Sequence, residues 1–304
     1  MFQHFSELVS SGVPCLFYSD FVGERFHCYK IDELPLYDIE FSFNSVPHES
    51  NAPHKPLFTP IRFEEYRQKF DMVQEHIQCG NTYLLNLTQP TALESEYSLK
   101  EIYTMAHAQY KLRVKDQFVC FSPEPFITIE DDTIHTYPMK GTIDASIPNA
   151  IDIIINDPKE LAEHTMIVDL LRNDLGIVAK DIYVERFRYI TTIDTGSKKL
   201  HQVSSHICGV LDKQWRNNAG KLISSLLPAG SVSGTPKRKT VEIIKEVEGY
   251  NRGYFTGVFG HFDGTNLYSA VAIRFIENCE GNLIYKSGGG ITADSNPRNE
   301  YQEL

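Results

Sequence analysis

A carboxylate on the apolar face of a predicted helix is the feature that most constrains how this 304-residue chain can fold. In the segment LAEHTMIVDLLRNDLG, the helical repeat places Glu163 on one face with Met166, Ile167 and Leu170. Burying an unpaired carboxylate is costly. Glu163 is therefore expected either to bind a metal ion or to form a buried ion pair, and the sequence leaves both alternatives open.

Both ends of this helix carry strong signals. Asp157 is the expected N-cap, Pro158 takes the first helical position, and Glu160 completes a predicted capping box. Gly176 follows the last apolar residues of the pattern and predicts the end of the helix.

Composition excludes several classes of protein. The net charge of −11 argues against a nucleic-acid binder, whose surface would be basic. No apolar run approaches the roughly 20 residues that span a bilayer. The N-terminus lacks the features of a signal peptide. We therefore expect a cytoplasmic protein that contacts neither nucleic acid nor membrane. Its six scattered cysteines, without a CxxC pair, suggest neither a zinc site nor disulfides.

The order of predicted elements favours an α+β fold with largely antiparallel sheets, because paired strands alternate with helices irregularly. A Pro-rich connector suggests a shortened N-terminal region, 1–60, packed on a catalytic domain, 61–304, as one compact unit. Besides the Glu163 helix, helices are expected over about 63–78, 98–111, 215–226 and 236–248. Strands are expected over about 14–18, 25–29, 82–88, 117–120, 126–130, 133–137, 189–194, 201–210, 254–262, 267–275 and 283–287.

The segment GSVSGTPKRK places three cations in the first turn of a predicted helix with Thr235 as its N-cap and Pro236 at its first position. These cations are Lys237, Arg238 and Lys239, and they oppose the helix dipole at a cost of about 0.3–1 kcal/mol each. Either a bound anion compensates them, or they are solvated surface charges.

Near the C-terminus, Gly288, Gly289 and Gly290 form a predicted turn that could approach a ligand carboxylate closely, or that could simply be flexible. Glu300 and Glu303 follow on one helix face. Together with Glu163 they supply oxygen ligands without a nearby His/Cys cluster. Such ligands suit Mg²⁺ rather than zinc.

Two further residues could take part in chemistry. Lys140 stands between a strand and a Gly-Thr turn, where nearby cations could lower its pKa and make it a nucleophile; most lysines in such places are solvated. Glu124 lies in a proline-braced turn, where a carboxylate can act as an acid or base or can cap the turn.

The chain resembles the chorismate-utilising enzymes, and within them the aminodeoxychorismate synthases. The matching segments are FSPE, PMKGT, LAEHTMIVDLLRNDLG, HQVSS, LPAGSVSGTPK, VAIR and GGGITADSNPRNEYQE, in family order. The resemblance implies a four-layer α/β/β/α fold with two orthogonally packed sheets. The lysine of PMKGT indicates the aminodeoxychorismate group, since anthranilate and isochorismate synthases typically carry alanine there.

The resemblance also implies a role for each matching residue. Lys140 would attack ring carbon 2 of chorismate, and Glu124 would serve as acid and base for the departing 4-hydroxyl. Mg²⁺ would be bound directly by Glu163 and Glu303 and through water by Glu300. The remaining residues would bind the substrate: Thr142, His201, Ser231, Arg274, Gly288, Gly289 and Gly290.

The product implied is 4-amino-4-deoxychorismate, an intermediate of p-aminobenzoate and folate biosynthesis. No Cys-His glutaminase signature is present, so ammonia would come from solution or from a glutamine amidotransferase subunit in a transient heterodimer. The alternatives are anthranilate or isochorismate synthase activity and an inactive chorismate-binding homologue.

Overall fold

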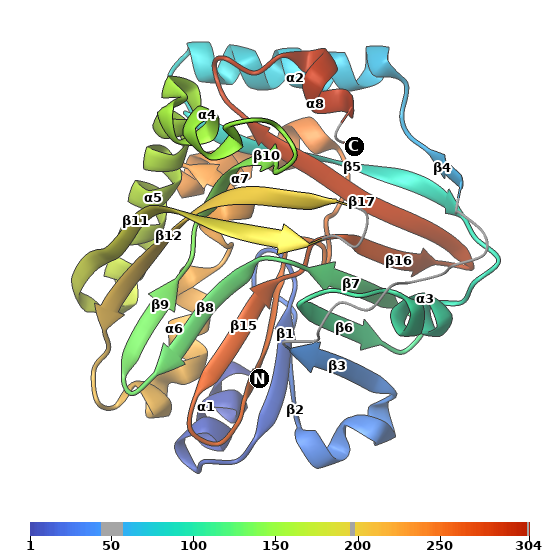
Figure 1. Cartoon of the computed structure of the whole chain (residues 1–304). Coiled ribbons are helices and arrows are strands. Elements are labelled where there is room, and N and C mark those ends of the chain that lie inside the picture. Colours follow the sequence, from blue (N-terminus) through green and yellow to red (C-terminus); the bar gives the residue numbers. More distant parts are fainter. Residues whose placement is uncertain (44–56, 195–197, 303) are drawn as a thin grey trace.

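The computed structural model describes residues 1–43, 57–194, 198–302 and 304. Two antiparallel sheets pack between two layers of helices, so the expected α+β fold with an α/β/β/α arrangement is confirmed (Figure 1). Glu303, a predicted metal ligand, and most of the predicted connector, residues 45–56 of 45–60, lie outside the described residues.

Within the described part of the chain, the first sheet has nine strands and the second has eight. In the first sheet the order is β10 (Met139–Asp144), β12 (Lys199–Val210), β9 (Thr133–Thr136), β8 (Pro125–Glu130), β15 (Leu267–Val271), β14 (Val258–Phe262), β1 (Cys15–Ser19) and β2 (Phe26–Lys30), with β11 (Lys180–Asp194) paired to β12. In the second it is β13 (Gly234–Thr235), β5 (Leu84–Glu94), β17 (Asn282–Ile291), β16 (Phe275–Cys279), β7 (Phe118–Ser122), β6 (Tyr110–Val114) and β3 (Ile39–Phe43), with β4 (Leu57–Thr59) paired to β5.

The helices divide between the outer faces of the two sheets. The first sheet packs against α1 (Phe2–Ser10), α4 (Ala150–Asn156), α5 (Pro158–Val178) and α6 (Ala219–Leu226). The second packs against α2 (Phe63–Gln78), α3 (Leu99–Met105), α7 (Lys237–Glu248) and α8 (Pro297–Gln302). Short 3₁₀ segments are η1 (Ile31–Tyr37), η2 (Trp215–Asn218) and η3 (Gly230–Val232).

Strand β1 shows why the layers form. All of its residues are buried, and they alternate between two cores. Cys15 and Phe17 pack with the helices behind the first sheet, whereas Leu16 and Tyr18 pack between the two sheets. Because β1 pairs with β14 and β3 pairs with β6, the region before residue 60 contributes strands to both sheets. The division at residue 60 stays a prediction.

The predicted strand over 267–275 is wrong, because the chain changes sheets within it. Strand β15 ends at Val271 in the first sheet, and β16 begins at Phe275 in the second. Arg274 lies between them with φ 51°, which turns the chain.

The predicted glycine turn is also wrong. Gly288, Gly289 and Gly290 lie inside β17, opposite Thr88, Leu87 and Asn86 of β5. A Cβ on Gly288 would lie 2.3 Å from the Leu87 carbonyl oxygen, so this glycine permits the close approach of β5.

Helix ends differ from expectation at three places. Helix α5 continues through Gly176 to Val178. Helix α7 begins at Lys237, with Pro236 rather than Thr235 as its cap. The helix expected over 98–111 ends at Met105, because Tyr110–Val114 pairs with β7 and β3. No helix among the described residues is long and apolar enough to cross a membrane.

Candidate active site

Lys140 projects from an irregular part of β10. Met139 pairs with Ser204 and Thr142 with Gln202, so the register shifts between them, and Lys140 and Gly141 form a bulge. Gly141 has φ +96°, a conformation that side chains other than hydrogen rarely adopt. The bulge directs Lys140 toward helix α5.

A buried histidine fixes the backbone of this bulge. His164 of α5 is fully buried, and its Nδ1 lies 3.2 Å from the carbonyl oxygen of Lys140. Its Nε2 lies 2.7 Å from Oγ of Ser205 on β12. His164 therefore connects α5 to β10, which carries Lys140, and to the neighbouring strand β12. No sequence pattern marked His164, although it lies beside Glu163 in the LAEH segment.

Glu163 forms an ion pair with Lys140, one of the two alternatives that the sequence left open. Lys140 Nζ lies 3.0 Å from Glu163 Oε2, and the Glu163 side chain is only 13% exposed. Lys159 Nζ lies 3.7 Å from the other oxygen. The Asp157 carboxylate accepts hydrogen bonds from Lys159 N and Glu160 N at the start of α5, as an N-cap should.

The expected lowering of the Lys140 pKa by nearby cations is wrong, because its neighbours are carboxylates. Burial acts to lower the pKa of Lys140. The negative charges of Glu163, Glu160 and Glu300 outweigh burial, so the pKa is raised above its ordinary value. The amine is therefore an ammonium in the free protein.

Glu160 is a site residue that the sequence analysis took only for a cap. Its carboxylate points inward instead of closing the capping box, and Oε2 is buried without a hydrogen-bond partner among the described residues. A Cβ on Gly141 would lie 2.7 Å from this oxygen, so the glycine makes room for it. Burial and the charge of Glu163 raise the pKa of Glu160. The spacing of three between these glutamates was the available signal.

The carboxylates around Lys140 fit a hard divalent cation. Glu160 and Glu163 come from α5, and Glu300, which acts electrostatically on Lys140, comes from α8. A buried, unpartnered carboxylate oxygen is costly by itself, and a cation would satisfy it. An all-oxygen donor set is the kind that Mg²⁺ prefers.

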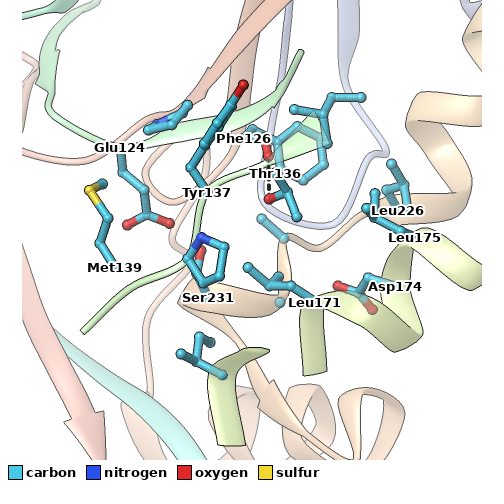
Figure 2. A pocket seen from close by; sticks show the side chains of 16 residues that line it. Glu124, Phe126, Thr136, Tyr137, Met139, Leu171, Asp174, Leu175, Leu226 and Ser231 are labelled. Carbon is cyan, nitrogen blue, oxygen red and sulfur yellow. Dashed lines mark hydrogen bonds between the residues drawn. The ribbon is translucent and has the colours of Figure 1, made fainter. Parts of the chain in front are cut away.

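Glu124 lies in the turn between β7 and β8. Burial raises the pKa of its carboxyl group, and a hydrogen bond from Ser231 of η3 partly offsets this. Figure 2 shows the Glu124 carboxylate directed toward Ser231. A carboxyl group with a raised pKa is suited to donate a proton.

A cavity of about 100 Å³ brings several of these side chains together. Among the expected site residues, its lining includes Glu124, Lys140, Glu163, Ser231 and Gly290. A smaller neighbouring cavity of about 30 Å³, drawn in Figure 2, shares Glu124, Met139, Ile167 and Ser231 with it. Glu124 thus faces both spaces.

The remaining expected substrate residues are outside the lining of this cavity, and their contacts with substrate stay a prediction. Among the described residues that line the cavity, Thr142, His201, Arg274, Gly288 and Gly289 do not occur. The Thr142 side chain is exposed, and His201 Nδ1 lies 3.0 Å from Thr192 Oγ1 on the neighbouring strand. Arg274 is exposed at the sheet corner. Burial raises the pKa of the nearby Tyr285, and the positive charge of Arg274 partly offsets this effect.

The cations of the GSVSGTPKRK segment have partners within the chain, so a bound anion is not required there. Lys237 Nζ lies 2.8 Å from Asp174 Oδ1 and donates to the Leu226 carbonyl. Lys239 pairs with Glu242 at 3.2 Å. The segment contributes to the site differently, because Ser231, Ser233 and Gly234 line the cavity.

Asn86 lines the cavity, and no sequence pattern marked it as a site residue. Its backbone is fixed on both sides, since its N–H donates to the Ser233 carbonyl and its own carbonyl accepts from Arg252. Its side-chain Oδ1 is buried without a hydrogen-bond partner among the described residues. This oxygen is free to accept a hydrogen bond from a molecule in the cavity.

A family model described as chorismate binding enzyme matches residues 29–304 of the chain. An uncharacterized PabA-like protein of Haemophilus influenzae is 46% identical over 311 residues, which cover 99% of this chain and 94% of that protein. Aminodeoxychorismate synthase component 1 of Escherichia coli is 32% identical over 259 residues, covering 79% of this chain and 55% of that one. This chain therefore matches little more than half the length of that synthase.

Solved structures share the fold. The menaquinone-specific isochorismate synthase MenF of Escherichia coli matches with a TM-score of 0.73 at 15% identity, covering 98% of this chain and 77% of that one. Anthranilate synthase component I of Streptococcus pneumoniae matches with a TM-score of 0.68 at 24% identity, covering 82% and 58% respectively.

Proposed function

Because the chain belongs to the chorismate-binding enzyme family, we propose that it aminates chorismate to 4-amino-4-deoxychorismate in a Mg²⁺-dependent reaction. One observation carries the choice among chorismate reactions. The amine of Lys140 lies in the same cavity as a carboxyl group with a raised pKa, Glu124, and beside the carboxylates that fit a cation.

The chain's own residues account for two displacements. The Lys140 amine attacks ring carbon 2, the ring double bonds shift, and the 4-hydroxyl leaves with the proton of Glu124. Ammonia then adds at carbon 4, the double bonds shift back, and the lysine leaves. Splitting one difficult displacement into two through a covalent adduct is the benefit of nucleophilic catalysis.

Lys140 has to lose its proton before it attacks, and the surrounding carboxylates oppose this. Mg²⁺ held by Glu163, Glu300 and Glu303, with Glu160 beside them, would draw the carboxylates and the substrate's carboxylate together and weaken their hold on that proton. Arg274, Thr142, His201 and the amides of Gly288–Gly290 keep their proposed contacts to the rest of the substrate.

Ammonia is proposed to come from a glutamine amidotransferase subunit that binds transiently. Relatives named component 1 of aminodeoxychorismate synthase imply at least one further component, which supports this proposal.

The test is to incubate the protein with chorismate, Mg²⁺ and an ammonium salt, with and without the lyase that releases p-aminobenzoate, and to separate the products by chromatography. Formation of 4-amino-4-deoxychorismate, converted to p-aminobenzoate only when the lyase is present, supports the proposal. Anthranilate or isochorismate as the main product contradicts it. Chorismate that binds but is not consumed identifies an inactive homologue.

A further inference from the structure

Two histidines and a cysteine meet on the first sheet, and none of them is among the described residues that line the two cavities. His135 lies on β9, and His206 and Cys208 lie two residues apart on β12. Cys208 pairs directly with His135 in the strand register. Ile134 and Ile207 point into the core behind the sheet, so the three side chains share the opposite face.

The donor atoms of these side chains are close enough to bind one ion. Nδ1 of His135 lies 3.1 Å from Nε2 of His206 and 3.3 Å from Sγ of Cys208. Nε2 of His206 lies 3.3 Å from the same sulfur. Tetrahedral zinc separates such donors by about 3.3–3.6 Å, so a bound ion requires only a small opening of the cluster.

A metal-binding histidine commonly hydrogen-bonds a carboxylate through its second ring nitrogen, and Glu185 of β11 is placed to do this for His206. Oε2 of Glu185 lies 2.9 Å from Nδ1 of His206, so that Nε2 faces the other two donor atoms. The same oxygen lies 3.3 Å from Cys208 Sγ. The register of β11 shifts between Val184 and Arg186, and this bulge places Glu185 beside β12.

Neighbouring side chains fix the orientation of the cluster, and one side of it is accessible to solvent. Tyr137 stacks on the His206 ring at 4.5 Å. Glu185 is 49% exposed, so an ion can enter from solvent. Burial lowers the pKa of both histidines, which leaves their rings neutral, and burial raises the pKa of Cys208 to about 11. An ion therefore has to displace the thiol proton.

We propose that His135, His206 and Cys208 form a binding site for a thiophilic divalent metal ion, with zinc as the preferred ion. Imidazole and thiolate ligands suit zinc, whereas the carboxylates around Lys140 suit Mg²⁺. The site does not depend on the proposed reaction. The scattered cysteines gave no sign of it, because the ligands come together across strands rather than within a motif.

The experiment uses the untagged full chain after dialysis against a chelator. Zinc is titrated in competition with a chromophoric chelator, and Co²⁺ serves as a spectroscopic probe. One equivalent of zinc and a thiolate-to-cobalt charge-transfer band are expected. Cys208→Ser should abolish the band and weaken zinc binding at least about tenfold. Absence of stoichiometric binding, or equal affinity in Cys208→Ser, overturns the proposal.

Two control variants separate this site from others. Cys279→Ser removes an exposed cysteine whose thiol contacts Glu277, and zinc binding should be unchanged. Glu163→Gln, at the other site, should also leave it unchanged. If Cys208→Ser fails to fold, Glu185→Gln keeps all three ligands and should weaken zinc binding about tenfold. Zinc affinity that is indifferent to Glu185→Gln would then contradict the site.

Discussion

The charges next to Lys140 decide what its amine can do. In the free protein it is an ammonium ion paired with Glu163, a geometry that stabilises the fold and opposes nucleophilic attack. Lys140 is thus both the ion-pair partner of Glu163 and the proposed nucleophile, and measuring binding and turnover in variants separates the two roles.

We expect Lys140→Ala to lower the rate of 4-amino-4-deoxychorismate formation at least about 100-fold while chorismate still binds. Rate losses of this size are typical when an enzyme loses its nucleophile or its general acid or base. Initial rates and calorimetric binding check this. Lys159→Ala is the matched control, since Lys159 also contacts Glu163 but is 56% exposed and outside the cavity lining among the described residues. Turnover near the unchanged rate in Lys140→Ala would remove the covalent role. Residual anthranilate formation would support it.

Glu160 is expected to cost stability in the metal-free protein. Its pKa is raised, so the folded state binds the proton more tightly than the unfolded state. Its contribution is therefore most favourable at acidic pH and is lost as the pH rises through the raised value. We expect Glu160→Gln to raise the free energy of unfolding without Mg²⁺ by about 1 kcal/mol at neutral pH and by less in acid. Urea denaturation at both pH values measures this, and a destabilised variant would contradict it.

Asn86 offers an unpartnered acceptor to the cavity. Leaving a ligand group without its partner costs roughly 1–3 kcal/mol, so Asn86→Ala should lower kcat/KM for chorismate at least about fivefold. Asn86→Asp keeps the acceptor and should retain more activity than Asn86→Ala, which separates loss of a hydrogen bond from loss of packing. Unchanged kinetics in Asn86→Ala would show that this oxygen bonds only to water.

At the scale of elements, local patterns predicted the long amphipathic helices but not the point at which a strand ends. The expected range 63–78 coincides with α2, because Tyr66, Phe70 and Val73 repeat at helical spacing and are buried. Residues 267–275 form one largely apolar run in the sequence, yet β15 belongs to the first sheet and β16 to the second. The chain bends between the two strands because each pairs with a different sheet, and strand pairing is a tertiary contact that local sequence does not contain.

The candidate site likewise contains residues that the sequence predicted and residues that it did not. Glu163, Lys140 and Glu124 were predicted, but their convergence rested on a resemblance, since no local spacing joins α5, β10 and the turn before β8. Glu160 was missed because an N-terminal glutamate also explains a helix cap. Asn86 was missed because a single asparagine in a strand carries no pattern.

The corner between β15 and β16 combines strain with a proposed contact. Arg274 has φ 51°, a left-handed conformation that costs an L-residue about 1–2 kcal/mol. Arg274→Gly should therefore not destabilise the fold, whereas chorismate affinity should fall because a bidentate cation is lost. Arg274→Lys keeps the charge and the strain and should bind with intermediate affinity. Thermal unfolding and calorimetric titration measure the two effects. Wild-type affinity in both variants would remove Arg274 from the substrate site.

At the scale of the whole molecule, the cavity lies where the two halves of the fold meet. Its lining comes from β10 and α5 on the side of the first sheet, and from β5, β17 and the segment around η3 on the other. The carboxylates that fit a cation are divided likewise between α5 and α8. A bound cation would link helices of both outer layers.

This arrangement predicts that Mg²⁺ and chorismate strengthen each other's binding, because each would complete the other's site. Calorimetric titration of chorismate at increasing Mg²⁺ concentration should show tighter binding until the ion saturates. Glu163→Gln should reduce this coupling, and by reciprocity the effect of chorismate on Mg²⁺ affinity should fall by the same factor. Asp169→Asn, on the exposed face of the same helix, is the matched control and should leave the coupling unchanged. If chorismate affinity is indifferent both to Mg²⁺ and to Glu163→Gln, the glutamate serves only as the partner of Lys140 and the cation site is wrong.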